Sequence, residues 1–379
     1  MLVNPYPVMY QSIKITDIEI FKLNIPLKNP FIISLGTITA ANNIIIKIHT
    51  NQGIYGIGEG CPYIYIVGET QESDFEIAKK IAVLLKNKNP LQIEERLADI
   101  HRAIKFNPTI KSAFDMALYD LLGKYAQMPL YALFGGKNDR QIFTDMTVSL
   151  NTPELMAAEA LKFKTQGFQA IKVKLGTNKK DDVARIEAIR ETVGEEIPLR
   201  IDANQGWDCT TAIATLKALE IHDIEHCEEP IPRWNHWDWV KVRNASPIPI
   251  MADESLFDEH DAFRLASVGA CDYFNIKLSK SGGIHSALKI ISIAEAAGIK
   301  SQVGCMSESR LALTAVAHLA MARKNIIHFD MDSALMLSQD PVVGGIQYVE
   351  NGKIILPESI GIGADIHENY LQAMEKVAV

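Results

Sequence analysis

The stretch "QAIKVKLG", residues 169–176, decides the fold, because it has the alternation of a short strand and carries two lysines. Side chains at i and i+2 of a strand point to the same side, so Lys172 and Lys174 enter one space. Taken alone, the stretch would also fit a strand at the edge of a sheet, with both lysine side chains in water. Lysines are seldom buried without partners, so a buried strand of this kind predicts acidic groups or a ligand in that space.

The same pattern of a short apolar strand and an amphipathic helix recurs along the second part of the chain. The strand candidates are 144–150, 170–175, 198–204, 224–229, 249–254, 273–278, 300–305 and 326–332. Eight such units predict an α/β fold whose parallel strands close into a barrel, with functional groups at their carboxyl ends. A doubly wound open sheet is the alternative. It would concentrate polar residues at one switch point, whereas polar residues here follow nearly every strand.

The residues on either side of these units have other patterns, and the chain is therefore expected to have three parts. Residues 1–136 begin with β-type alternation and continue with helical spacing, as in an α+β domain. Residues 137–340 hold the barrel. No clear amphipathic helix follows the eighth strand, so we expect residues 341–379 to form a segment that returns to the first domain.

Composition and charge narrow the class of protein. With 47% apolar and 22% charged residues, the chain is typical of a soluble globular enzyme and not of a disordered protein. The net charge of −8, without any basic run, argues against a nucleic-acid partner. Residues 1–12 show no signal-peptide pattern, and no apolar run approaches the roughly 18 residues of a membrane span. We therefore expect a cytoplasmic protein with no membrane partner, and a homo-oligomer. The five cysteines form no C-x-x-C pair, which argues against disulfides and a thiolate zinc site.

Three acidic residues end successive strands: Asp202 the third, Glu228 the fourth and Asp253 the fifth. Each one alone could be a turn or helix-cap residue. Because neighbouring parallel strands end at the same mouth of a barrel, three in a row are expected to converge. Their hard oxygen ligands suit Mg²⁺. A lone histidine near the end of the fourth strand, His226, is interpreted as a structural group.

The lysines of the second and sixth strands bracket these carboxylates from opposite sides. A proton next to a carboxylate is a very weak acid, so its removal requires a base and a divalent cation that stabilises the enediolate. Lysine can serve as the base if its pKa is lowered, and a neighbouring ammonium group acts in that direction. We therefore expect Lys174 to act as acid or base and Lys172 to hold a substrate carboxylate, with Lys277 on the other side.

The segments "IKVKLG", "RIDANQGW", "EEP", "MADES" and "NIKLSKSGG" together resemble the enolase superfamily, in its muconate-lactonizing subgroup. The resemblance implies a modified TIM (β/α)7β barrel with an N-terminal α+β capping domain. It also implies Mg²⁺ on Asp202, Glu228 and Asp253, with Lys174 and Lys277 as the two acid/base groups and Glu229 supporting the ligands from behind.

The segment "HFDMDSALML" is similar to the Asp-x-Asp signature of dipeptide epimerases, in which two carboxylates hold the α-ammonium group of a dipeptide. Asp330 and Asp332 match it. The resemblance further implies substrate contacts from Thr147, Lys172 and Cys305. It implies a Mg²⁺-dependent dipeptide epimerase that inverts the α-carbon of the C-terminal residue of a dipeptide such as L-Ala-D/L-Glu, and hence a role in murein peptide metabolism.

Two other functions stay open at this point. A cycloisomerase or o-succinylbenzoate synthase of the same subgroup would use the same barrel ligands but would have no reason to hold an ammonium group. A non-catalytic binding or structural barrel would be expected to have lost a metal ligand or a base, and all five of these residues are present.

One position departs from the family pattern. L-Ala-D/L-Glu epimerases carry a basic residue in a mobile loop of the N-terminal domain, where it meets the glutamate side chain, and "ISLGTITAANN" places Gly36 there. Either a cation from elsewhere replaces it, or the second residue of the substrate is less acidic.

Overall fold

The eight predicted strands form one parallel sheet in the computed structural model, which describes residues 13–379. The strands are β5 (Met146–Val148), β6 (Ile171–Lys174), β7 (Leu199–Asp202), β8 (Ile224–Glu228), β9 (Ile250–Ala252), β10 (Tyr273–Ile276), β11 (Lys300–Val303) and β12 (Ile326–Phe329). Their order in the sheet is their order in the chain. The amide of Asp145 donates to the carbonyl of Phe329 at 3.1 Å, which joins the first strand to the last. The prediction of a barrel is confirmed, and the doubly wound sheet is excluded because its strand order would reverse at a switch point.

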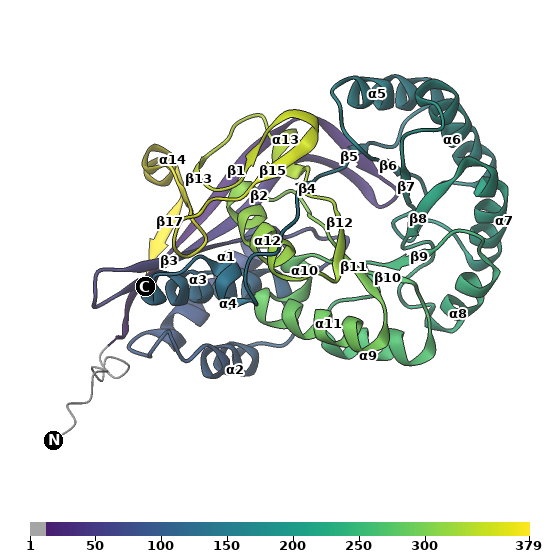
Figure 1. Ribbon diagram of the computed structural model, residues 1–379. Helices are drawn as coiled ribbons and strands as arrows, with labels where there is room; N and C mark the ends of the chain where they lie inside the picture. Colours follow the sequence, from purple (N-terminus) through teal and green to yellow (C-terminus); the bar gives the residue numbers. More distant parts are fainter. Residues whose placement is uncertain (1–12) are drawn as a thin grey trace.

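Helices cover the outside of this barrel as an arc that is seen in Figure 1. They are α5 (Pro153–Thr165), α6 (Lys179–Val193), α7 (Cys209–Leu219), α8 (His236–Ala245), α9 (Glu259–Val268) and α11 (Ile284–Ala297). Two further helices of this part, α10 (Leu278–Ser281) and α12 (Arg310–Ala322), are buried within the molecule. Directly after β12 the chain makes the short helix α13 (Ser333–Met336). The eighth unit therefore lacks a full helix, as expected for a modified TIM barrel.

An antiparallel sheet and its helices form the cap. The sheet contains β1 (Ile15–Ile33), β2 (Gly36–Thr50) and β3 (Tyr55–Gly60), and the cap helices are α1 (Gln71–Leu85), α2 (Ile93–Ala103), α3 (Pro108–Ala126) and α4 (Leu130–Leu133). The remaining elements are β4 (Ile142–Phe143), β13 (Val342–Gly344), β14 (Gln347–Tyr348), β15 (Lys353–Ile355), β16 (Ala364–Ile366), α14 (Glu368–Ala373) and β17 (Lys376–Ala378). β17 pairs with β1, so the end of the chain lies in the sheet with which the described part begins (Figure 1).

Alternate glycines of β3 let helix α3 lie directly on the sheet. A methyl group on Gly56 or Gly58 would overlap the backbone carbonyl oxygens of Ala117 and Ala113, respectively. Two residues of a strand and four residues of a helix both span about 6 Å, so the two glycines match one row of the helix. The stretch "YGIGEG" therefore fixes how closely the cap helices approach the sheet.

The hairpin of β1 and β2 reaches over the carboxyl end of the barrel. The hydroxyl of Ser34 donates to the carbonyls of Ala203 at 3.0 Å and Asn204 at 2.9 Å, just beyond β7. The amide of Ile32 donates to the hydroxyl of Ser149 at 2.7 Å, just beyond β5. The tip of the cap is thereby tied to the barrel mouth, where the functional groups were predicted.

Three further expectations concern the chain as a whole. All five cysteines are free and buried, in agreement with the absence of a disulfide framework. Among the helices of residues 13–379, none is long and apolar enough to cross a membrane. The stretch 1–12, where no signal-peptide pattern was found, lies outside the described residues.

Candidate active site

Three carboxylates meet at the carboxyl ends of three neighbouring strands. Asp202 is the last residue of β7, Glu228 is the last of β8, and Asp253 directly follows β9. Asp202 and Glu228 are direct partners in the strand register, and all three residues are fully buried. The structure therefore brings together the three residues that were predicted to bind a metal.

The lysines lie on both flanks of this carboxylate group. The ammonium nitrogen of Lys174 is 2.6 Å from Asp202 on one side, and that of Lys277 is 2.7 Å from Asp253 on the other. Lys172 lies between them and deeper, 2.7 Å from Glu228 and 3.2 Å from Asp202. Since β7, β8 and β9 separate β6 from β10, the two outer lysines face each other across the carboxylates.

Of the three carboxylates, Glu228 is the one whose buried negative charge the neighbouring lysines do not fully compensate. The pKa of Glu228 is raised to about 8, first by burial and then by Asp202 and Asp253, in spite of the neighbouring lysines. The pKa of Asp253 is held well below its usual range because Lys277 and Lys280 outweigh its burial. The pKa of Lys277 is well above its usual value because carboxylates outweigh burial. A divalent cation among the carboxylates would supply the missing charge.

The donor set fits such a cation. Asp202, Glu228 and Asp253 offer buried carboxylate oxygens, and the Oε2 atom of Glu254 is buried without a hydrogen-bond partner among residues 13–379. These are hard ligands without sulfur or imidazole, which favours Mg²⁺ over a softer metal. The three predicted ligands are thus suited to hold the ion.

Polar side chains behind the carboxylates fix their orientation. The amide of Asn275 donates to Glu228 at 2.8 Å, and that of Asn204 donates to Glu254 at 3.0 Å. Glu229 accepts the backbone N–H of Asp253 at 2.8 Å and so holds the turn that carries this ligand. The sequence reasoning missed Asn204 and Asn275. Asn204 follows Asp202 by two residues, and Asn275 precedes Lys277 by two residues. Because side chains two residues apart on a strand point to the same side, the alternation could have revealed both asparagines.

The two aspartates after β12 lie next to Lys172. Asp330 is 2.8 Å from its ammonium nitrogen, and Asp332 accepts the backbone N–H of Thr147 at 2.8 Å. The thiol of Cys305 lies 3.7 Å from Asp332. Burial and the neighbouring Asp330 raise the pKa of Asp332 to about 6. The predicted substrate-binding residues therefore lie together around the acidic pair, and Thr147 contacts Asp332 through its side chain as well as its backbone.

A cavity of about 400 Å³ lies above the lysines, between the barrel mouth and the cap. From the barrel it is lined by Lys174, Asn204, Lys277, Cys305, Met306 and Ser307, and from the cap mainly by the segments 31–42 and 61–72. Among its cap residues no lysine, arginine or histidine is present within the described chain. Among residues 13–379, the cationic side chains that line the cavity are therefore the two lysines of the barrel.

Gly36, which stands where the resemblance to L-Ala-D/L-Glu epimerases implied a basic residue, lies against two tyrosines. It has a φ of +150°, and a methyl group on it would contact the ring of Tyr65 at 3.4 Å and the hydroxyl of Tyr63 at 3.5 Å. The two tyrosine rings meet edge to face at 5.6 Å. The cap wall beside Gly36 is therefore aromatic, and the acidic residues Glu69 and Glu72 also line the cavity.

Comparisons with known proteins agree with this geometry. Residues 15–135 match the family described as "Mandelate racemase / muconate lactonizing enzyme, N-terminal domain". Residues 155–370 match the family described as "Enolase C-terminal domain-like". The two matches together cover most of the chain and confirm the resemblance that was predicted from the short motifs.

Several relatives match over nearly their whole length. The D-Ala-D/L-Ala epimerase of Cytophaga hutchinsonii is 48% identical over 96% of this chain and 99% of its own. A crystal structure of a dipeptide epimerase from that organism, complexed with Mg and D-Ala-L-Val, has a TM-score of 0.96 and covers 97% of this chain and 100% of that chain, at 48% identity. The hydrophobic dipeptide epimerase of Enterococcus faecalis is 42% identical, over 92% of this chain and 99% of its own. The L-Ala-D/L-Glu epimerase of Bacillus subtilis is 39% identical, over 92% and 96%. This chain therefore belongs to the mandelate racemase/muconate lactonizing enzyme family of the enolase superfamily.

Proposed function

We propose that this protein is a Mg²⁺-dependent dipeptide epimerase, an isomerase that inverts the α-carbon of the C-terminal residue of a dipeptide. One observation carries the proposal: Lys174 and Lys277 lie on opposite flanks of a buried carboxylate group, and an acidic pair lies beside it. Relatives that are 38–48% identical and bear the names of dipeptide epimerases support it.

Asp202, Glu228 and Asp253 would hold the metal ion, which supplies stabilisation of the negative charge that develops on the substrate carboxylate. Lys172 is proposed to contact that carboxylate from below, because three acidic partners fix the position of its ammonium group. These contacts would hold the α-carbon of the second residue in the space between Lys174 and Lys277.

The two lysines then divide the proton transfers. Carboxylates raise the pKa of Lys277, and a cation bound among them would offset this effect. One lysine would then act as the free amine and take the α-proton from its face of the carbon, and the other would donate a proton to the opposite face. Each lysine is the base for one stereoisomer and the acid for the other. Asp330 and Asp332 would bind the α-ammonium group of the first residue, since charge-assisted hydrogen bonds to two carboxylates are strong and directional.

The cavity wall predicts an uncharged second side chain. A glutamate carboxylate placed against Tyr63 and Tyr65 would lose its hydration without gaining a cation from the cap, which is unfavourable. We expect kcat/KM for L-Ala-L-Val, L-Ala-L-Leu and their D-Ala counterparts to exceed that for L-Ala-L-Glu by about tenfold or more.

The measurement is a screen of dipeptides for Mg²⁺-dependent deuterium incorporation from D₂O at the second residue. The same dipeptides with an acetylated amino group are the matched control and should not react. Fastest turnover of L-Ala-L-Glu would contradict the proposed specificity, and no turnover of any dipeptide would contradict the proposed function.

Replacing Asp330 with asparagine separates the epimerase from the cycloisomerase and o-succinylbenzoate synthase alternatives. The change removes one charge from the group that would bind the ammonium, so KM for a dipeptide should rise by about tenfold or more. A synthase or cycloisomerase, whose substrate has no amine, should be little affected. The test is steady-state turnover of a dipeptide and of the amine-free acids by parent and variant. Sustained turnover of an amine-free acid without reaction of any dipeptide would favour the alternative.

A non-catalytic barrel is less well supported, because no metal ligand or lysine of the predicted set has been lost. A cytoplasmic location, a homo-oligomeric state and a role in murein peptide metabolism stay predictions from the sequence.

A further inference from the structure

Arg200 is held inside the barrel, one layer below the active site, by three partners. It precedes Asp202 by two residues on β7, so both side chains point into the barrel. Its guanidinium group donates to Glu225 at 2.6 Å and to Asp145 at 2.8 Å, and a third nitrogen lies 3.0 Å from Nδ1 of His328. Arg200 is therefore immobilised by residues of β8, of β12 and of the segment before β5.

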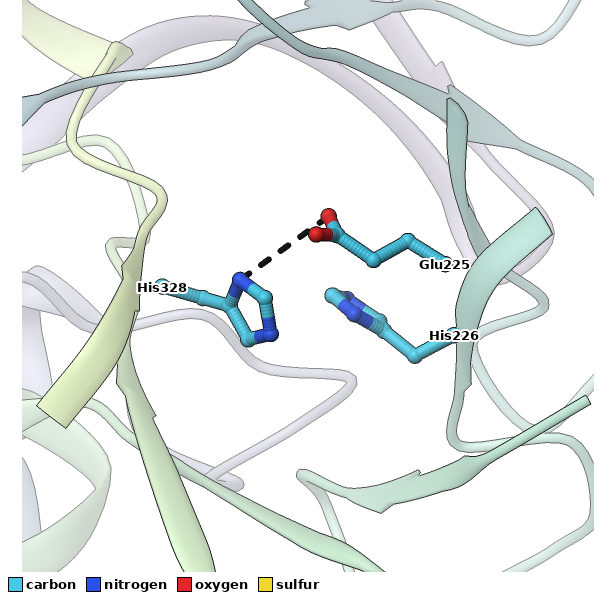
Figure 2. Close-up of side chains that lie close together, drawn as sticks. All are labelled: Glu225, His226 and His328. Atoms are coloured by element: carbon cyan, nitrogen blue, oxygen red, sulfur yellow. Dashed lines mark ion pairs between the residues drawn. The ribbon is translucent and has the colours of Figure 1, made fainter. Parts of the chain in front are cut away.

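Glu225, His226 and His328 point toward one another across the barrel interior in Figure 2 and resemble a set of metal ligands. The guanidinium of Arg200 is hydrogen-bonded to both Glu225 and His328, so it already occupies the place of a cation in this group. Burial and Arg200 lower the pKa of His328 to about 4, and its neutral ring can accept from the guanidinium. Arg200 is therefore the cation that Glu225 and His328 bind.

The strands are shaped for this arrangement. The register between β7 and β8 shifts from Leu199–Ile224 to Arg200–His226, so that β8 contributes an extra residue, Glu225. Such a bulge turns two successive side chains toward the same region. A matching shift occurs between β11 and β12, just before His328.

Asp145, the remaining partner of Arg200, lies next to the acidic pair of the active site. It is 1% exposed, and its second carboxylate oxygen, Oδ1, is buried with no hydrogen-bond partner among the described residues. The backbone around it is tied to the segment of the acidic pair. The hydroxyl of Thr144 accepts the N–H of Met331 at 2.9 Å, and the N–H of Thr147 binds Asp332. Asp145 therefore lies in a segment that is hydrogen-bonded on both sides to the segment of the acidic pair.

The charges around Asp145 do not balance. It faces Asp330 and Asp332 from the segment after β12, Lys172 from β6 and Arg200 from β7. Three carboxylates thus share two cations, and Lys172 is shared with the metal-binding carboxylates as well. Burial and Asp330 raise the pKa of Asp145 to about 8, so near neutral pH a proton balances the group. The positive charge of a bound ammonium group would balance these carboxylates in place of the proton.

We propose that Asp145 is a positioning residue of the ammonium site, with Arg200 as its fixed counter-ion, and that the group of Asp145, Asp330 and Asp332 releases a proton when the ammonium of a dipeptide binds. This inference rests on the proposed function, because it requires that a dipeptide binds with its amino group at the acidic pair. It assigns Asp145 and Arg200 a part in substrate recognition, and it predicts a proton release that can be measured.

Proton release is measured by titration calorimetry of the Mg²⁺-saturated protein with L-Ala-L-Val at pH 7, in buffers of different ionisation enthalpy. About 0.4 proton should be released for each dipeptide bound, since a coupling of about one pKa unit lowers the protonated fraction of a carboxyl group with a pKa near 8 from about 0.9 to about 0.5 at pH 7. The Asp145→Asn variant, and the parent with the N-acetylated dipeptide, should release none.

Steady-state kinetics distinguish this role from a merely structural one. Asparagine imitates the protonated carboxyl group, so KM of Asp145→Asn should be close to that of the parent at pH 6. The ratio of variant to parent KM should rise to about tenfold at pH 8.5, the change that corresponds to one unit of pKa coupling. The pKa of the substrate amine affects both proteins equally and cancels in this ratio. The matched control is Asp115→Asn, which replaces an equally buried aspartate that accepts the N–H of Ile284 at 2.6 Å, and its KM ratio should not vary with pH.

A parent protein that epimerises dipeptides but releases no proton would overturn this inference and leave the proposed function intact. A KM ratio that is the same at every pH would do so as well. A parent protein that reacts with no dipeptide would overturn both. Because the calorimetry of the parent needs no substitution, the result holds even if Asp145→Asn does not fold.

Discussion

Replacing Lys174 with alanine is expected to abolish epimerisation, with kcat lowered by a factor of about 1,000 or more. One stereoisomer of the dipeptide should nevertheless still exchange its α-proton for solvent deuterium, because Lys277 remains on the opposite flank. Lys277→Ala should show the reverse, with exchange of only the other stereoisomer. The measurement is deuterium incorporation into each separate stereoisomer in D₂O, followed by NMR.

The control is Lys300→Ala, which removes an exposed lysine of the same barrel and should leave both exchanges unchanged. The division of labour between the lysines would be wrong if Lys174→Ala, while folded and able to bind Mg²⁺, lost exchange from both stereoisomers. It would also be wrong if both variants retained the same one.

The second large effect is expected for Glu228→Gln. Glu228 is the central carboxylate of the metal group and also pairs with Lys172 at 2.7 Å. The change removes a charged metal ligand and leaves a buried ammonium group with one partner fewer, so activity should fall by about 1,000-fold and Mg²⁺ affinity by about 100-fold. Calorimetric titration with Mg²⁺ and turnover at saturating Mg²⁺ measure the two effects. Glu195→Gln, at an exposed glutamate, is the control.

The pH dependence of metal binding follows from the same residue. The pKa of Glu228 is raised to about 8, so below that pH the ion must displace a proton. Apparent Mg²⁺ affinity of the parent should therefore decrease by up to about tenfold for each pH unit below 8 and level off above it. Glu228→Gln should lose this dependence. A parent affinity that does not change between pH 6 and 8 would contradict the raised pKa of Glu228.

The barrel and its polar mouth could be predicted from the sequence because both depend on local pattern. Alternation within each strand places Lys172 and Lys174 on one side, and neighbouring parallel strands bring Asp202 and Glu228 to one level. The predicted strands extend beyond the observed ones at their carboxyl ends. There the polar residues leave the ladder of backbone hydrogen bonds and turn toward the site, as Asp253 does after β9.

The parts that could not be predicted depend on contacts between distant segments. The link from Asp145 through Arg200 to His328 joins three strands, and no spacing in the sequence indicates it. The bulge that turns Glu225 inward is likewise invisible in the pattern. The tyrosines beside Gly36 come from another part of the cap, so the sequence could indicate that a basic residue was absent but not what replaced it.

The central claim is that two amines approach one carbon from opposite sides above a shared metal ion. A crystal structure of the protein with Mg²⁺ and L-Ala-L-Val tests it most directly. The ammonium nitrogens of Lys174 and Lys277 should both lie about 3 to 3.5 Å from the α-carbon of valine, on opposite faces, with the valine carboxylate next to the ion held by Asp202, Glu228 and Asp253. A dipeptide bound with both lysines on one face, or with its ammonium group away from Asp330 and Asp332, would contradict the account.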